Sequence, residues 1–203
     1  MSSRTLIALT LTALAILAPR PAGSATWEID PAHTSVQFSV RHMMVSNVRG
    51  QFETVAGRIQ ADEANPTAAR VEATIETASI DTNNNKRDDH LRGPDFLDAV
   101  KFPQITFVSK KVEKAGEAKW KLTGDLTLHG VTREVVLEMD GPTAPRKDPM
   151  GTIRSGAQAR TKINRQDFGI SFNKALDGGG LVVGDEVVIT IDVEVVRASE
   201  ATR

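Results

Sequence analysis

From Ser35 onward, apolar and polar side chains alternate with a period of two residues. In the segment SVQFSVRH, Val36, Phe38 and Val40 share one face and His42 continues it. The segment EVVITIDVEVV repeats this pattern, with valine or isoleucine at every second position. Because successive side chains of a strand point to opposite faces, each such segment predicts a strand with one buried face.

Eight segments carry this alternation, and turn residues such as Asn65-Pro66 and His129-Gly130 separate them. Closing such a set of strands into a barrel removes the exposed edges that an open sheet would leave. We therefore expect an all-β fold, an eight-stranded antiparallel barrel, with a two-sheet sandwich as the alternative. The predicted strands are residues 35–45, 48–59, 70–80, 104–112, 119–128, 133–140, 152–163 and 186–196.

One internal segment interrupts the strand pattern and predicts a short polar helix over residues 85–92. Asn84 or Asn85 can cap its first turn, and Asp88 and Asp89 favour the positive end of the helix dipole. Gly93 ends it. The barrel is therefore expected to carry a short helical insert.

The N-terminus is typical of a secretory signal peptide. Arg4 precedes an apolar run from Leu6 to Ala18, and small residues end at Ala25. The run is shorter than the roughly 20 residues that a transmembrane helix needs. We expect a signal peptide over residues 1–25, a barrel domain over 26–198 and a tail over 199–203, with the mature protein in the periplasm.

Composition excludes several kinds of chemistry and partner. The chain has no cysteine, which removes disulfides, thiolate nucleophiles and Cys-ligated metal sites. It has 25 Lys and Arg against 26 Asp and Glu, so no overall basic field attracts nucleic acid. No second apolar run reaches the length of a transmembrane helix, so we expect no stable membrane insertion.

The predicted inner faces combine large and small side chains. Ala73, Gly124, Ala157 and Ala159 occupy positions where a filled core would favour leucine or phenylalanine. An eight-stranded barrel is just wide enough to be filled by side chains or to hold one small ligand. The small residues favour a cavity, although each could instead make room for a large neighbour.

Four blocks of sequence, residues 27–59, 87–112, 124–137 and 163–170, resemble in order the YceI-like family of periplasmic lipid-binding proteins. The resemblance covers residues 27 to about 196. It implies a lipocalin-like eight-stranded barrel that encloses an elongated apolar pocket for a polyisoprenoid or similar long-chain lipid. It also implies non-catalytic binding or transport, without a cofactor.

Positions in the matching blocks suggest the ligand-binding residues. Leu91 and Phe96 of the helical insert are expected to cover one end of the pocket, and His42, His90, Arg165 and Asp167 are the candidates for contact with a head group. The expected wall contacts are Phe38, Val40, Phe52, Phe107, Leu122 and Phe168.

Two other classes of function are alternatives to lipid binding. A metal-dependent hydrolase would use histidines and acids, for example Asp88 to His90, but neither a G-x-S-x-G elbow nor an H-E-x-x-H motif is present. His33 and His42 would suit a metal only if their strands converged, and His33 can instead pair with Asp30. We therefore expect no catalytic residue and no metal.

The other alternative is an interaction partner or quinone-handling accessory of a membrane redox protein. The oligomeric state stays open, a homodimer included.

Overall fold

The computed structural model describes residues 23–62, 64–177 and 179–198. Most of the predicted signal peptide and the whole predicted tail lie outside these residues, so both remain predictions. No helix in the described ranges is long and apolar enough to cross a membrane.

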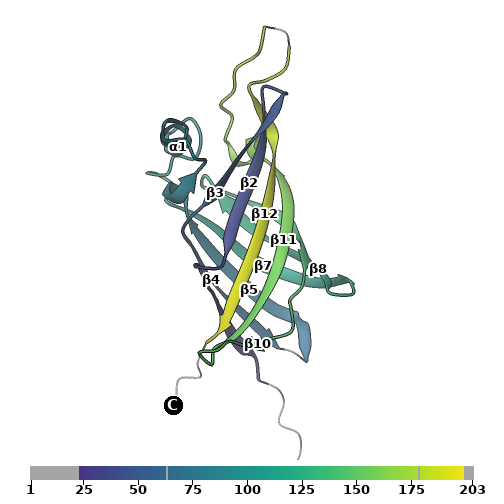
Figure 1. Cartoon of the computed structure of the whole chain (residues 1–203). Coiled ribbons are helices and arrows are strands. Elements are labelled where there is room, and N and C mark those ends of the chain that lie inside the picture. The colour runs from purple at the N-terminus through teal and green to yellow at the C-terminus, as the bar shows by residue number, and fades with distance from the viewer. Residues whose placement is uncertain (1–22, 63, 178, 199–203) are drawn as a thin grey trace, which may run out of the picture.

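Strands dominate the structure, as the alternating pattern predicts. Twelve strands pair antiparallel in one sheet, and β11 also pairs with β12, which closes the sheet into a barrel (Figure 1). The strands are β1 (Ala25–Ile29), β2 (Ser35–His42), β3 (Ser46–Phe52), β4 (Val55–Asp62), β5 (Asn65–Glu76), β6 (Ile80–Asp81), β7 (Gln104–Gly116), β8 (Lys119–Leu128), β9 (Val131–Asp140), β10 (Arg146–Lys147), β11 (Ile153–Asn164) and β12 (Val183–Arg197).

The closed antiparallel barrel of eight strands is confirmed, although three of its long strands are broken in two. β1 and β2 follow one another along one side of β12, and they pair in turn with β4 and β3. β5 and β6 then pair with β4 and β3. The predicted strand 48–59 is thus interrupted at Glu53 and Thr54, between β3 and β4.

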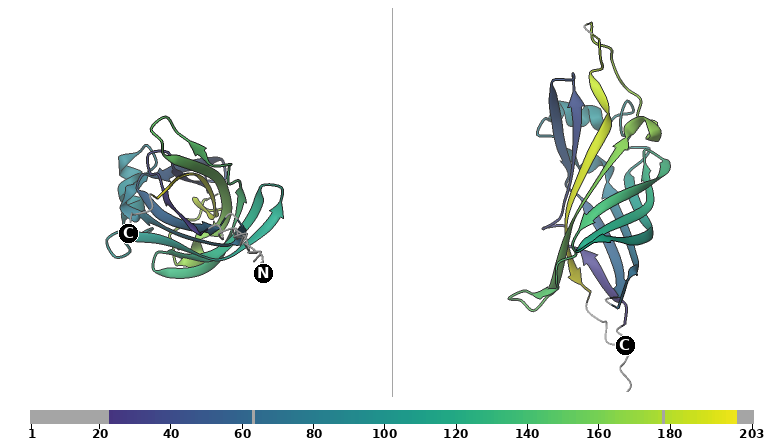
Figure 2. Two further views of the ribbon diagram at one scale, coloured as in Figure 1. Left: turned by 90° about the horizontal axis from the view of Figure 1, so that it is seen from below. Right: turned by 90° about the vertical axis from the view of Figure 1, so that its right-hand side faces the viewer.

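β11 completes the barrel, because it pairs with β12 along a long ladder and with β9 along a short one. β12 pairs with β11 from Glu186 to Val196, whereas β9 pairs with β11 only over Gln158 to Arg160. In Figure 2 the long β11 and β12 run steeply beside the more tilted β7, β8 and β9. The ribbon seen from below forms a ring, with the helix against its rim.

The helical insert forms where it is predicted. α1 (Asn85–Arg92) begins after Asn84, whose side-chain oxygen accepts a hydrogen bond from the backbone N–H of Arg87 at 3.0 Å. The N–H of Gly93 donates to the carbonyl of His90 and ends the helix. Two 3-10 turns, η1 (Thr77–Ser79) and η2 (Arg165–Phe168), complete the regular elements.

Glycines let two phenylalanine rings lie against the barrel wall. A side chain at Gly50 would begin 2.5 Å from the Phe38 ring, and one at Gly124 would begin 2.5 Å from the Phe107 ring. Gly124 was expected to leave space in a cavity, and this expectation is wrong because the Phe107 ring occupies that space. The other three small residues, Ala73, Ala157 and Ala159, do face the interior.

Candidate functional site

The barrel interior is a cavity of about 950 Å³, lined mainly by aliphatic and aromatic side chains. Its wall includes the inward faces of β2, β5, β8, β11 and β12. Val187, Ile189 and Ile191 of β12 point inward yet remain only partly buried. Inward side chains of a filled core would be fully covered by neighbours, so the partial exposure of these three indicates a hollow barrel. A cavity of this size and composition matches the usual sites for small apolar ligands.

Most of the predicted wall residues lie on this cavity, although their contact with a ligand remains a prediction. Phe38 and Phe52 pack against each other, with ring centroids 5.8 Å apart. Leu91 and Phe96, from α1 and the turn after it, also lie on the wall. The predicted residues on the wall are Phe38, Val40, Phe52, Leu91, Phe96, Phe107 and Leu122.

Phe168 is an exception, because it does not line the cavity. It lies in η2 rather than in a strand, and its side chain is 2% exposed within a core cluster that includes Ile163 and Ile170. Its backbone carbonyl lies 3.1 Å from the His129 imidazole Nδ1. Phe168 therefore fixes the loop after β11 to the β8–β9 turn.

Three of the four head-group candidates line the cavity, and the fourth lies elsewhere. His42 and His90 lie on the cavity wall, as does Arg165. Asp167 is exposed in η2 and is not on the wall, and its backbone carbonyl accepts a hydrogen bond from Arg133 Nε at 3.2 Å. Asp167 therefore lies off the cavity wall, because η2 does not continue the strand alternation, and its contact with a head group stays a prediction.

Arg165 directs its guanidinium at the protein backbone. Its Nε donates to the carbonyl of Gly184 at 3.0 Å, and its Nη1 donates to the carbonyls of Ile170 and Phe172 at 2.7 and 2.9 Å. Its Nη2 donates to Asp185 Oδ1 at 3.1 Å. Burial lowers the pKa of Arg165, and the Asp185 carboxylate opposes this effect. With these donors occupied, Arg165 holds the chain after η2 against β12 and has little capacity left for a head group.

His90 joins the helical insert to the loop that follows η2. Its ring contacts those of Phe96 and Phe172 edge-on, with centroids 5.0 and 5.2 Å apart. Its Nε2 lies 3.0 Å from Asp95 Oδ2. Aromatic pairs of this geometry are favourable beyond their buried area, so the three rings fix one end of the cavity.

Several residues on the cavity wall were missed by the sequence prediction. Arg87 of α1 and Lys174 of the loop before β12 both line the cavity. The segment from Pro142 to Pro145, between β9 and β10, lies on the wall as well. The loop segments show no alternation, so periodicity carries no signal for which of their side chains turn inward.

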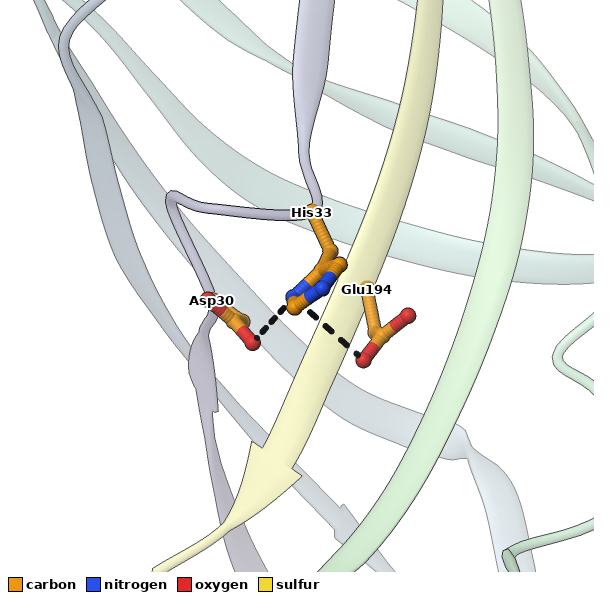
Figure 3. A group of neighbouring side chains, drawn as sticks. All are labelled: Asp30, His33 and Glu194. Carbon is orange, nitrogen blue, oxygen red and sulfur yellow. Dashed lines mark hydrogen bonds and ion pairs between the residues drawn. The ribbon is translucent and has the colours of Figure 1, made fainter. Parts of the chain in front are cut away.

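A second polar cluster lies outside the cavity, at the turn between β1 and β2. His33 Nδ1 is 2.9 Å from Asp30 Oδ2 and 3.9 Å from Glu194 Oε1 (Figure 3). The predicted pairing of His33 with Asp30 is therefore confirmed. The ligand atoms of Asp30, His33 and Glu194 lie within 4.8 Å of one another, which is close enough to hold a metal ion.

Arg154 already supplies the positive charge that this cluster needs. Its Nη1 donates to Asp30 Oδ2 at 2.6 Å and to Glu194 Oε1 at 2.7 Å, and its Nε donates to Asp148 at 2.8 Å. Hydrogen bonds from His33 and Arg154 lower the pKa of Asp30 to about 2. A metal ion would have to displace a guanidinium from both carboxylates, so this cluster is better explained as a brace that joins β1, β11 and β12.

Known proteins resemble this chain in sequence and in fold. The model of the YceI-like domain matches residues 27–195. A UPF0312 protein of Vibrio campbellii is 40% identical over 160 residues, which cover 78% of this chain and 84% of that protein. One of Shewanella putrefaciens is 38% identical over 165 residues, covering 80% of this chain and 86% of the relative.

Several solved structures have a similar fold. The crystal structure of BcnA from Burkholderia cenocepacia has a TM-score of 0.69 and 25% identity, and the alignment covers 82% of this chain and 98% of BcnA. The YCEI protein of Campylobacter jejuni has a TM-score of 0.64 and 33% identity, over 78% of this chain and 90% of that one. A polyisoprenoid binding domain from Saccharophagus degradans, at 13% identity, has a TM-score of 0.63 over 86% of this chain and 99% of that domain; this likeness concerns the fold alone. With the family model matched over nearly the whole barrel, this chain belongs to the YceI-like domain family.

Proposed function

We propose that the protein binds a long-chain apolar ligand, a polyisoprenoid or a similar lipid, inside the barrel, and that it does so in the periplasm without catalysing a reaction. The observation that carries the proposal is the apolar cavity of about 950 Å³. Each methylene buried there contributes about 0.8 kcal/mol, so a long tail gains enough to offset the cost of association.

The polar groups elsewhere support a binding role over a catalytic one. Asp88, which opens the DDH triplet, is 3% exposed and accepts a hydrogen bond from the backbone N–H of Thr82 at 3.0 Å. Asp89 pairs with Arg92, and His90 pairs with Asp95. These contacts give each member of the triplet a structural role. The signal-peptide pattern of residues 1–25 supports the periplasmic location.

A tail-length series tests the proposal. Delipidated protein is titrated with farnesol, geranylgeraniol and longer polyprenols, each competing with a fluorescent long-chain lipid. Affinity should rise at least about tenfold with each added isoprene unit until the cavity is filled, because every unit buries more apolar surface. Affinity that does not depend on tail length, or no binding of any polyprenol, would count against the barrel interior as the site.

A further inference from the structure

Charged side chains are unevenly distributed along the cavity wall. The acid on the wall, among the described residues, is Asp62, which pairs with Asn65 at the β4–β5 turn. The basic residues come instead from α1, the end of β2, η2 and the loop that precedes β12. We call this region the helix end of the cavity; its basic residues are Arg41, His42, Arg87, His90, Arg165 and Lys174.

Two of these basic groups are already paired with a carboxylate of the protein, and a third turns away from the cavity. Arg165 is paired with Asp185, and His90 lies against Asp95. Arg41 donates from its Nη2 to the carbonyl of Met44 at 2.8 Å, which turns its guanidinium toward the β2–β3 turn. The basic groups that are left to contact a ligand are therefore His42, Arg87 and Lys174, of which the last two offer a guanidinium and an ammonium group.

Arg87 is held in place but not neutralised. Its Nε and Nη2 donate to the hydroxyl and the carbonyl of Thr82, both at 2.7 Å. In the described part of the chain it forms no ion pair, because Asp88 accepts from Thr82 and Asp89 pairs with Arg92. Arg87 precedes His90 by three residues, so both side chains lie on one face of α1.

Lys174 approaches the same end from the loop before β12. Phe172 packs its ring against those of His90 and Phe96, which fixes this loop against the insert. The carbonyl of Lys174 accepts a hydrogen bond from the N–H of Val182 at 3.0 Å. Lys174 is an exposed residue at the rim of the cavity, and among the residues that the structure describes its ammonium group has no carboxylate partner.

We propose that the helix end of the cavity binds an anionic head group, a phosphate or a carboxylate, so that the protein selects anionic long-chain lipids over neutral ones. This inference rests on the proposed function. Hydrogen bonds between charged partners are roughly twice as strong as neutral ones, and a guanidinium and an ammonium together suit the oxygens of a phosphate. A neutral alcohol would leave both cations without a counter-charge from the ligand.

The test compares two lipids that share one tail. Geranylgeranyl phosphate and geranylgeraniol are titrated into delipidated wild-type protein, Lys174→Gln, Arg87→Gln and Lys121→Gln. Lys121 is exposed on β8 and lies off the cavity wall. Lys121→Gln is therefore the control, since it removes one positive charge, as the other variants do, but at a site away from the cavity. We expect wild type and Lys121→Gln to bind the phosphate at least about tenfold more tightly than the alcohol, a difference of about 1.4 kcal/mol.

In each of the other two variants this preference should fall severalfold, and in wild type it should shrink at high salt. Because Arg87→Gln removes the bonds to Thr82, Lys174→Gln is the decisive variant if Arg87→Gln does not fold. Equal affinity for the two lipids in wild type, or an unchanged preference in Lys174→Gln, would overturn the inference and leave the proposed function standing. Failure of both lipids to bind would instead defeat the proposed function.

Inorganic phosphate without a tail distinguishes a lipid head group from a free anion. On the present inference it competes weakly with geranylgeranyl phosphate, because most of the binding free energy comes from the tail. Displacement of the lipid by inorganic phosphate at an equal concentration would indicate a site for the free anion and would refute selection of a lipid.

Discussion

Thr161→Trp tests whether the barrel is hollow. Thr161 faces the cavity from β11, opposite Ile189 in the β11–β12 ladder, and is only partly buried. In a filled core, a tryptophan there would overpack its neighbours and cost typically 1 to 3 kcal/mol. At roughly 2 to 4 °C per kcal/mol for a domain of 150 to 250 residues, the melting temperature would fall by about 2 to 12 °C.

In the hollow barrel the indole ring instead fills empty space. We expect the melting temperature of the delipidated variant to be equal to or above that of wild type. The ring covers roughly 150 Å² of wall, which at about 25 cal/mol per Å² removes about 4 kcal/mol of ligand burial. Affinity for a fluorescent long-chain lipid should therefore fall by at least about a hundredfold.

Arg160→Trp is the matched control, since Arg160 precedes Thr161 in β11 and is exposed outside the cavity. It should leave lipid affinity close to that of wild type. The assays are thermal unfolding of delipidated protein and titration with the fluorescent lipid. A large fall in the melting temperature of Thr161→Trp would refute the hollow barrel, and a stable Thr161→Trp variant that binds lipid normally would place the ligand elsewhere.

Three further predictions concern the polar brace and the N-terminus. Because hydrogen bonds from His33 and Arg154 lower the pKa of Asp30 from 3.8 to about 2, its carboxylate stabilises the fold above about pH 4 and loses this effect as the pH falls toward 2. The difference in urea midpoint between wild type and Asp30→Asn should therefore shrink between pH 5 and pH 2, and a constant difference would contradict this. Zinc at pH 7 should leave the melting temperature unchanged because Arg154 occupies the space between Asp30 and Glu194; a rise that is lost in His33→Ala would show a metal site after all. Expressed in a bacterium with its export machinery, the protein should be found in the periplasm with Thr26 as its first residue, and N-terminal sequencing that finds Met1 on folded periplasmic protein would refute the signal peptide.

Much of the barrel could be predicted because its strands are half-buried and alternate over long stretches. The alternation also predicted inward residues of the wall, such as Phe38 and Val40. The alternation did not predict β1 (Ala25–Ile29), because a strand of five residues is too short to show a pattern of its own. It also did not predict the break between β3 and β4, which is visible only from their different partners, β6 and β5.

The polar residues of the site were harder to predict. Phe168 and Asp167 lie in η2, where alternation no longer determines which side chains face inward. Arg165 was a reasonable head-group candidate by its position, but carbonyls from two later segments occupy its donors. Lys174 reaches the cavity because Phe172 anchors its loop to α1, a contact between segments that are far apart in the sequence.

Mass spectrometry of the organic extract from natively purified protein tests the central claim most directly. The account predicts a near-stoichiometric lipid with a long hydrocarbon tail in wild type and in Arg160→Trp, and its loss from Thr161→Trp. Recovery of no long-chain lipid from folded wild-type protein, or of equal amounts from all three proteins, would contradict the claim that the barrel cavity holds such a ligand.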